Sequence, residues 1–222
     1  MEKVMIFDFN GTMIFDGKIQ KSSWKKFIKQ EFNRSMTENE FAQHIAGRNN
    51  QHTFEYYLGR KLSEQELAET SEKKEQLYRS ECLKRSELFQ LVDGLPEFLD
   101  YCREKGIRLN IATASEPSNV DFFFEHLHLE KWFDREKVAL NDGRLAGKPA
   151  PDIFLKAIEN LGVTPKQSVV FEDSLSGIKA ANNAQAGKVV LVEDKNLAPV
   201  KIPAKLRVDR VINDYQNVDG LI

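Results

Sequence analysis

The chain has 222 residues, enough for one medium-sized domain or for a core with a smaller insert. Its 32 basic and 34 acidic side chains nearly cancel, and a formal net charge of -2 provides no basic field for a nucleic-acid backbone. No apolar run approaches the roughly 18 residues of a membrane-spanning helix, and we expect no leader peptide before the first apolar run. Two cysteines without a secretory signal do not indicate a disulfide framework. We expect a cytoplasmic monomer with neither a nucleic-acid nor a membrane partner.

The first quarter of the chain changes from a strand pattern to helix patterns. Residues 3–8 form a continuous apolar run that ends in an acid, which predicts a strand buried on both faces. A turn is expected at 15–17. From there to about Leu88 the apolar residues follow helical spacing, and capping-box sequences at 37–40 and 63–66 mark two helix starts. This stretch predicts an all-helical insertion of about 70 residues.

From Asp93 onward, strand and helix patterns alternate, and no element is assigned to the charged tail after Asp194. Strands are expected at 108–113, 137–140, 168–171 and 188–192, and amphipathic helices at 95–105, 120–127, 153–161 and 178–184. This alternation predicts an α/β fold, a Rossmann-like parallel sheet core with helices on both faces. The core is expected to comprise 1–14 and 89–222, with 15–88 as the inserted all-helical domain.

Polar residues follow three of the predicted strands. Asp8 ends the first strand, Thr113 the second, and Glu172 with Asp173 the third. Because parallel strands end at the same edge of a sheet, we expect these side chains to converge. Carboxylates crowded at one edge repel one another unless a cation joins them, and Mg²⁺ prefers oxygen ligands. The sequence therefore predicts a magnesium site at this edge.

The loop at 147–152 adds a cation to this set. Two prolines stiffen the backbone immediately after Lys148. An ammonium group presented rigidly beside the hydroxyl of Thr113 is suited to bind a phosphate group.

Taken in chain order, these motifs resemble those of the haloacid dehalogenase-like hydrolase superfamily. The resemblance covers nearly the whole chain, and four motifs in sequence are strongly specific. The helical insert after the first motif is similar to the helical cap domain of the β-phosphoglucomutase-like branch. The matching segments are Asp8-Phe9-Asn10-Gly11-Thr12, Thr113, Lys148-Pro149 and Glu172-Asp173.

The resemblance implies phosphoryl transfer through an aspartyl-phosphate on the nucleophile Asp8. Thr113 and Lys148 would hold the transferring phosphoryl group. The implied Mg²⁺ ligands are Asp8, the main-chain carbonyl of Asn10, Glu172 and Asp173. The implied substrate contacts near the nucleophile are Gly11, Thr12, Thr113, Ala114 and Lys148.

The side chain of Asn10 departs from the family pattern, in which an aspartate protonates the leaving oxygen and then activates water. An amide can donate a hydrogen bond but cannot exchange a proton usefully near neutral pH. General acid–base help is typically worth about 10²–10⁴-fold in rate. We therefore expect a slow phosphatase that acts on a small phosphorylated metabolite.

Two alternatives remain open at this stage. One is a hexose-phosphate mutase, against which Asn10 counts because that reaction depends most on the proton shuttle. The other is a regulatory protein that binds phosphate and rarely turns over. In the insertion, Arg48 and Asn50 are candidate substrate contacts, and His52 is a candidate stand-in for the missing acid. Arg48 and His52 also fit surface or helix-start positions.

Overall fold

The structure is a computed structural model that describes residues 3–45, 49–216 and 218. It separates into two compact units, one formed by Met1–Phe15 with Gln90–Ile222 and the other by Asp16–Phe89. Because the second unit interrupts the first in sequence, the first unit is assembled from two distant segments of the chain.

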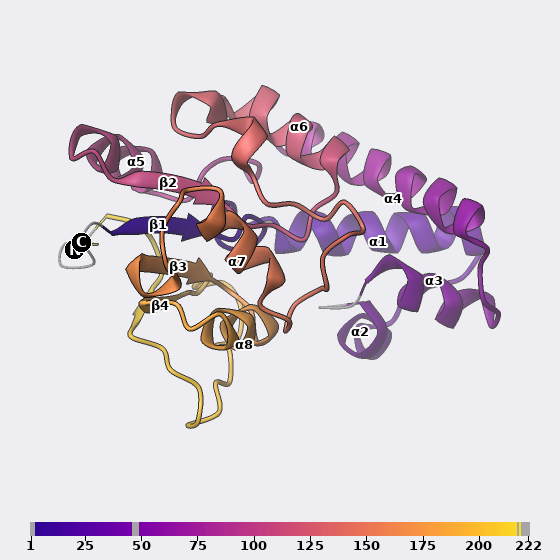
Figure 1. The fold of residues 1–222 in the computed structure, drawn as a ribbon. Helices are drawn as coiled ribbons and strands as arrows, with labels where there is room; N and C mark the ends of the chain where they lie inside the picture. Colours follow the sequence, from indigo (N-terminus) through magenta and orange to yellow (C-terminus); the bar gives the residue numbers. More distant parts are fainter. Residues whose placement is uncertain (1–2, 46–48, 217, 219–222) are drawn as a thin grey trace. The chain divides into compact units, whose positions relative to one another are not determined.

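A five-stranded parallel sheet forms the centre of the first unit (Figure 1), in the order β2-β1-β3-β4-β5. In the central ladder Phe7 pairs with both Ile111 and Phe171, so the residues that follow these three positions lie at the same edge of the sheet. The strands are β1 (Val4–Phe7), β2 (Arg108–Ile111), β3 (Ser168–Glu172), β4 (Lys188–Val192) and β5 (Arg210–Ile212).

Helices cover both faces of this sheet, which explains why the central strand β1 is apolar throughout. On one face Val4, Ile6 and Val170 pack against α7 and α8. On the other face the ring of Phe7 contacts Phe98 of α5, with 6.4 Å between ring centroids. The helices of this unit are α5 (Leu95–Glu104), α6 (Pro117–Leu127), α7 (Asp152–Glu159) and α8 (Leu175–Asn183), with 3-10 turns η2 (Leu129–Lys131), η3 (Arg135–Lys137) and η4 (Pro165–Gln167).

Three details differ from the sequence-based expectations. The strand expected at 137–140 does not form: η3 occupies its start, and only a single bridge joins Ala139 to Ala112. No turn forms at the expected 15–17, because α1 already begins at Gly17. The turn lies earlier, at 11–13. The tail contains β5, a short edge strand whose central residue Val211 is half exposed. Only Ile212 of its three residues is buried, so β5 lacks the continuous apolar run by which a buried strand is recognised.

The second unit is all-helical, and both of its predicted capping boxes are present, at Thr37–Glu40 and Ser63–Glu66. Its core is aromatic, with Trp24, Phe27 and Phe54 at the centre. Within the described residues, no helix combines the length and the apolar composition that crossing a bilayer requires. The helices are α1 (Gly17–Phe32), α2 (Glu38–Glu40), the π-helix η1 (Phe41–Ile45), α3 (Asn50–Leu58) and α4 (Glu64–Lys84).

Candidate active site

Three carboxylates converge at the C-terminal edge of the sheet. Asp8 follows β1, and its backbone N–H donates to the carbonyl of Phe171 on β3 at 3.0 Å, which joins the two strand ends. One carboxylate oxygen from each of Asp8, Glu172 and Asp173 lies within 4.8 Å of the others. Two of these side chains, those of Asp8 and Glu172, are almost fully buried. The convergence predicted from the strand ends is therefore present in the fold.

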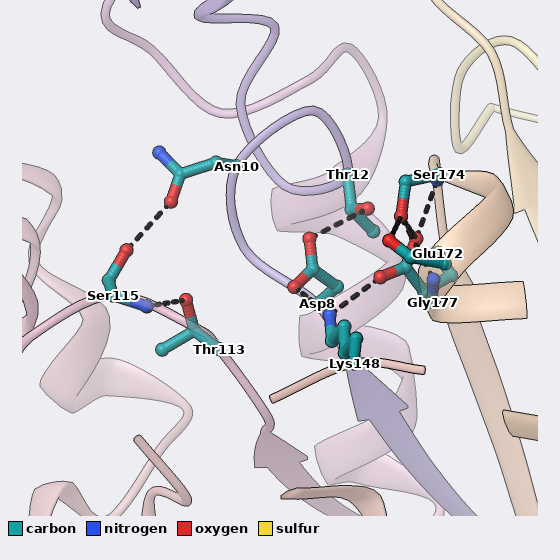
Figure 2. Close-up of polar contacts among 10 residues, drawn as sticks. Asp8, Asn10, Thr12, Thr113, Ser115, Lys148, Glu172, Ser174 and Gly177 are labelled. Atoms are coloured by element: carbon teal, nitrogen blue, oxygen red, sulfur yellow. Dashed lines mark hydrogen bonds and ion pairs between the residues drawn. The ribbon is translucent and has the colours of Figure 1, made fainter. Parts of the chain in front are cut away.

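Lys148 links two of the three acids (Figure 2). Its Nζ lies 2.5 Å from Oδ1 of Asp8 and 2.6 Å from Oε1 of Glu172. Burial raises the pKa of Asp8 to about 7; the charge of Lys148 opposes this rise, and that of Glu172 adds to it. Burial would lower the pKa of the Lys148 ammonium, but the negative charges of Asp8 and Glu172 hold it above its ordinary value. The lysine thus remains a cation between two acids.

Glu172 is held from its other side by the start of α8. Its Oε2 accepts hydrogen bonds from the backbone N–H of Ser174 at 2.6 Å and from the Ser174 hydroxyl at 3.0 Å. The same hydroxyl caps α8 by accepting from the N–H of Gly177. Gly177 has no side chain, and a Cβ at this position would overlap the Glu172 carboxylate. The helix start therefore fixes the orientation of Glu172.

The turn after β1 depends on a glycine for a similar reason. Gly11 adopts a φ of 80°, and a Cβ at this position would overlap the carboxylate of Asp173. The next residue, Thr12, is fully buried, and its hydroxyl donates to Oδ2 of Asp8 at 3.4 Å. The turn therefore brings both the nucleophile candidate and Asp173 into close packing with residues 11 and 12.

Asn10 and Thr113 are joined through Ser115, as Figure 2 shows. The Ser115 hydroxyl donates to Oδ1 of Asn10 at 2.8 Å, and the Ser115 backbone N–H donates to Oγ1 of Thr113 at 3.1 Å. The carbonyl of Ser115 also accepts from the N–H of Asn141 at 3.1 Å. Ser115 is thus anchored by its backbone while its side chain orients the Asn10 amide.

The composition of this cluster fits a hard divalent cation. Three carboxylates and the ammonium of Lys148 meet at the sheet edge, and carboxylates brought this close repel one another unless a cation joins them. Every candidate ligand is an oxygen, the donor type that Mg²⁺ and similar ions prefer. Both oxygens of Glu172 already accept hydrogen bonds from the protein. Both oxygens of Asp8 do so as well, so these contacts do not rank Asp8, Glu172 and Asp173 against one another as ligands.

The remaining predicted substrate contacts lie next to Thr113 or in the helical unit. Ala114 is an exposed residue directly after Thr113. Asn50 belongs to the helical unit, where its amide donates to Oε1 of Glu75 at 3.3 Å. Arg48 lies outside the described residues. His52 is exposed on α3, and its ring stacks on that of His44 with 5.7 Å between centroids.

Sequence reasoning missed four residues of the site. Ser174 had a usable signal, because a serine before an apolar helix is a typical N-cap. Ser115 and Tyr215 had none, since their contacts join segments far apart in the chain. Gly177 contacts only nearby residues, Glu172 and Ser174, but no local pattern marks a glycine there as part of the site. The hydroxyl of Tyr215 donates to the main-chain oxygen of Thr12 at 3.1 Å.

Known proteins resemble this chain in both sequence and structure. A phosphorylated carbohydrates phosphatase from Thermotoga maritima is 33% identical over 138 residues, which span 60% of this chain and 63% of that protein, somewhat under two thirds of its length. A HAD hydrolase of family IA, variant 3, from Entamoeba histolytica has a TM-score of 0.85 at 33% identity over 97% of this chain and 95% of that one. β-Phosphoglucomutase from Clostridium difficile shares the fold, with a TM-score of 0.76 at 22% identity over 99% of this chain and 94% of that one.

The family model for haloacid dehalogenase-like hydrolases matches residues 2–185, a span that contains every predicted motif from Asp8 to Asp173. The parallel sheet and the inserted helical unit agree with the architecture of the solved relatives. This chain belongs to the haloacid dehalogenase-like hydrolase family.

Proposed function

We propose that this protein is a Mg²⁺-dependent phosphatase that transfers the phosphoryl group of a small phosphorylated metabolite to Asp8. The observation that carries the proposal is the cluster of Asp8, Glu172 and Asp173 within 4.8 Å, with Lys148 between two of them. Oxygen ligands, a fixed cation and a carboxylate at a strand end are together the parts that phosphoryl transfer requires. A relative named as a phosphatase of phosphorylated carbohydrates supports the substrate class.

The nucleophile of the proposed reaction is a carboxylate oxygen of Asp8. It attacks phosphorus, the bond from phosphorus to the ester oxygen breaks, and an aspartyl-phosphate forms; water then releases inorganic phosphate and regenerates the carboxylate. Asp8, Asp173, the carbonyl of Asn10 and Glu172, directly or through one water, would hold the metal ion. A bound Mg²⁺ would supply positive charge that offsets the charge developing on the phosphoryl oxygens. Lys148 is already within reach of Asp8 and would contact the same oxygens.

In the proposed reaction, the side chain of Asn10 limits the rate of turnover. Its amide can donate a hydrogen bond but does not deliver a proton to the leaving oxygen, so esters with leaving groups of low pKa should react fastest. The second candidate function, a phosphate-binding regulatory protein with rare turnover, is favoured by this same side chain. A mutase would rely more heavily on proton transfer at position 10, so the amide of Asn10 does not favour that function.

The helical unit Asp16–Phe89 is proposed to act as a cap domain that selects the substrate, as the similarity to relatives with helical caps suggests. Asn50 and Arg48 remain the proposed contacts within it. A screen of phosphorylated carbohydrates against Asn50→Ala would test this part separately. Loss of selectivity at unchanged turnover of a small aryl phosphate is the expected result.

Incubation with Mg²⁺ and p-nitrophenyl phosphate, followed by trapping of the acyl phosphate, tests the main proposal. Turnover that chelation by EDTA removes and that Asp8→Asn abolishes supports the phosphatase. Phosphate binding without turnover or a trapped adduct would support the regulatory protein instead. Asp142→Asn, an identical change in the exposed turn at 141–143, is the matched control and should leave the rate unchanged.

A further inference from the structure

The segment after β5 places one side chain against the loop of the nucleophile. Tyr215 is buried, and its hydroxyl donates a hydrogen bond to the main-chain oxygen of Thr12, 203 positions earlier in the chain, at 3.1 Å. Tyr215 lies beyond residues 2–185, the span that matches the family model. The family match therefore assigns nothing to this residue.

The ring of Tyr215 packs under both acid-bearing strands. Its centroid lies 6.2 Å from that of Phe7 and 5.7 Å from that of Phe171. These two phenylalanines directly precede Asp8 and Glu172 in the sequence. A third ring, that of Phe98 on α5, stacks on Tyr215 at 5.9 Å. A displacement of Tyr215 would therefore also displace the ends of β1 and β3, because a packed interior transmits small displacements.

The backbone around Tyr215 is anchored as well. Its N–H donates to the carbonyl of Asp93 at 2.8 Å. The adjacent Gly94 has a φ of 78°, and a Cβ there would lie 2.6 Å from the backbone nitrogen of Gln216. The close approach of these two backbones therefore requires a glycine at position 94. It also fixes the position of Tyr215, and with it the hydrogen bond from the Tyr215 hydroxyl to Thr12.

We propose that Tyr215 is a positioning residue for the nucleophile, acting through the turn at 11–13. By holding the carbonyl of Thr12, it keeps the Thr12 hydroxyl directed at Oδ2 of Asp8 and keeps the carbonyl of Asn10 in place. Asp8 is then presented to phosphorus in a single orientation. This inference rests on the proposed function, since it assigns Tyr215 a part in the reaction of Asp8.

The variant Tyr215→Phe tests the inference, because it removes the hydroxyl and keeps the packed ring. The kcat for p-nitrophenyl phosphate is expected to fall about tenfold with KM unchanged, as is typical when a supporting hydrogen bond of an active-site group is lost. Tyr101→Phe, on the exposed surface of α5, is the matched control and should leave kcat unchanged. Assays well below the melting temperature of each variant separate positioning from loss of folded protein.

A second measurement does not depend on turnover. Beryllium fluoride with Mg²⁺ mimics a phosphoryl group on a carboxylate, and ¹⁹F NMR of the bound fluorides reports the adduct with Asp8. Tyr215→Phe should weaken formation of this adduct about tenfold and broaden its resonances. Gly94→Ala, which pushes the same backbone aside, should reproduce both effects.

The two proposals fail in different ways. Wild-type kcat and wild-type adduct affinity in Tyr215→Phe would overturn the positioning role while leaving the phosphatase intact. Absence of both turnover and adduct in the wild-type protein would instead overturn the proposed function. A lowered melting temperature with unchanged kcat would show that Tyr215 contributes only to stability.

Discussion

The Ser115 hydroxyl donates a hydrogen bond to Oδ1 of Asn10 at 2.8 Å and so connects the one residue that departs from the family pattern to the end of β2. The oxygen of an amide and that of a carboxylate occupy the same place and can both accept this bond. An aspartate at position 10 would therefore keep its partner. Replacement of Asn10 by aspartate would therefore change the acid–base chemistry of this side chain and keep its position.

Asn10→Asp should consequently raise the rate of phosphate release. The gain is expected to reach about 10²–10⁴-fold for substrates with poor leaving groups, since the carboxyl group can protonate the leaving oxygen. Steady-state rates for an alkyl phosphate and for p-nitrophenyl phosphate measure it, with the larger gain on the alkyl ester. Asn196→Asp, in the exposed loop after β4, controls for the added charge. Equal rates for Asn10→Asp and wild type would indicate a protein made for binding rather than hydrolysis.

Binding of Mg²⁺ should strengthen as the pH rises through about 7. Burial raises the pKa of Asp8 to about 7 from an ordinary 3.8, so the metal-free site holds a proton that the cation must displace. Because the folded state binds this proton more tightly than the unfolded chain, Asp8 lowers the stability of the metal-free protein as the pH rises from about 4 to 7. Calorimetric titrations in buffers of different ionisation enthalpy should detect proton release at pH 6.5 but hardly any at pH 8.5. Equal release at both values would contradict this assignment.

Gly177→Ala should damage the metal site while leaving the fold in place. The added methyl group would overlap the carboxylate of Glu172 and force it away from Lys148 and Ser174. A loss of about 10–100-fold in Mg²⁺ affinity or activity is expected, which is typical for displaced groups that support metal ligands. Gly147→Ala is the matched control, because a Cβ there meets open space. Isothermal titration of Mg²⁺ against both variants makes the comparison, and equal affinities would argue against a supporting role for Glu172.

The two cysteines should be unreactive in the native protein. Burial raises the pKa of both Cys82 and Cys102 to about 12, so the nucleophilic thiolate is almost absent at pH 8. Ellman's reagent should label neither thiol in buffer and both in guanidinium. Since the unfolded thiols ionise near pH 9, these residues contribute stability below that value, and the contribution is lost as the pH rises from about 9 to 12. Rapid labelling of the folded protein at pH 8 would show that one site is open to solvent.

Local sequence patterns were sufficient for most of the core of the fold. The apolar run at 3–8 has no polar interruption because both faces of β1 are covered, and that alone predicts a central strand of a parallel sheet. The capping boxes at 37–40 and 63–66 predict helix starts because their hydrogen bonds close within four residues. The edge strand β5 escaped prediction because Val211 is exposed and the strand is stabilised by pairing with β4 rather than by its own pattern.

The sequence by itself determined which groups are available for chemistry, namely Asp8, Lys148, Glu172 and Asp173. The rule that parallel strands end at the same edge was enough to predict that the three carboxylates converge. The tertiary structure alone decided how these groups are oriented. The contacts from Ser115 to Asn10 and from Tyr215 to Thr12 join residues 105 and 203 positions apart. Hydrogen bonds between residues so far apart produce no periodic pattern in the sequence, because they form only after the sheet has brought the segments together.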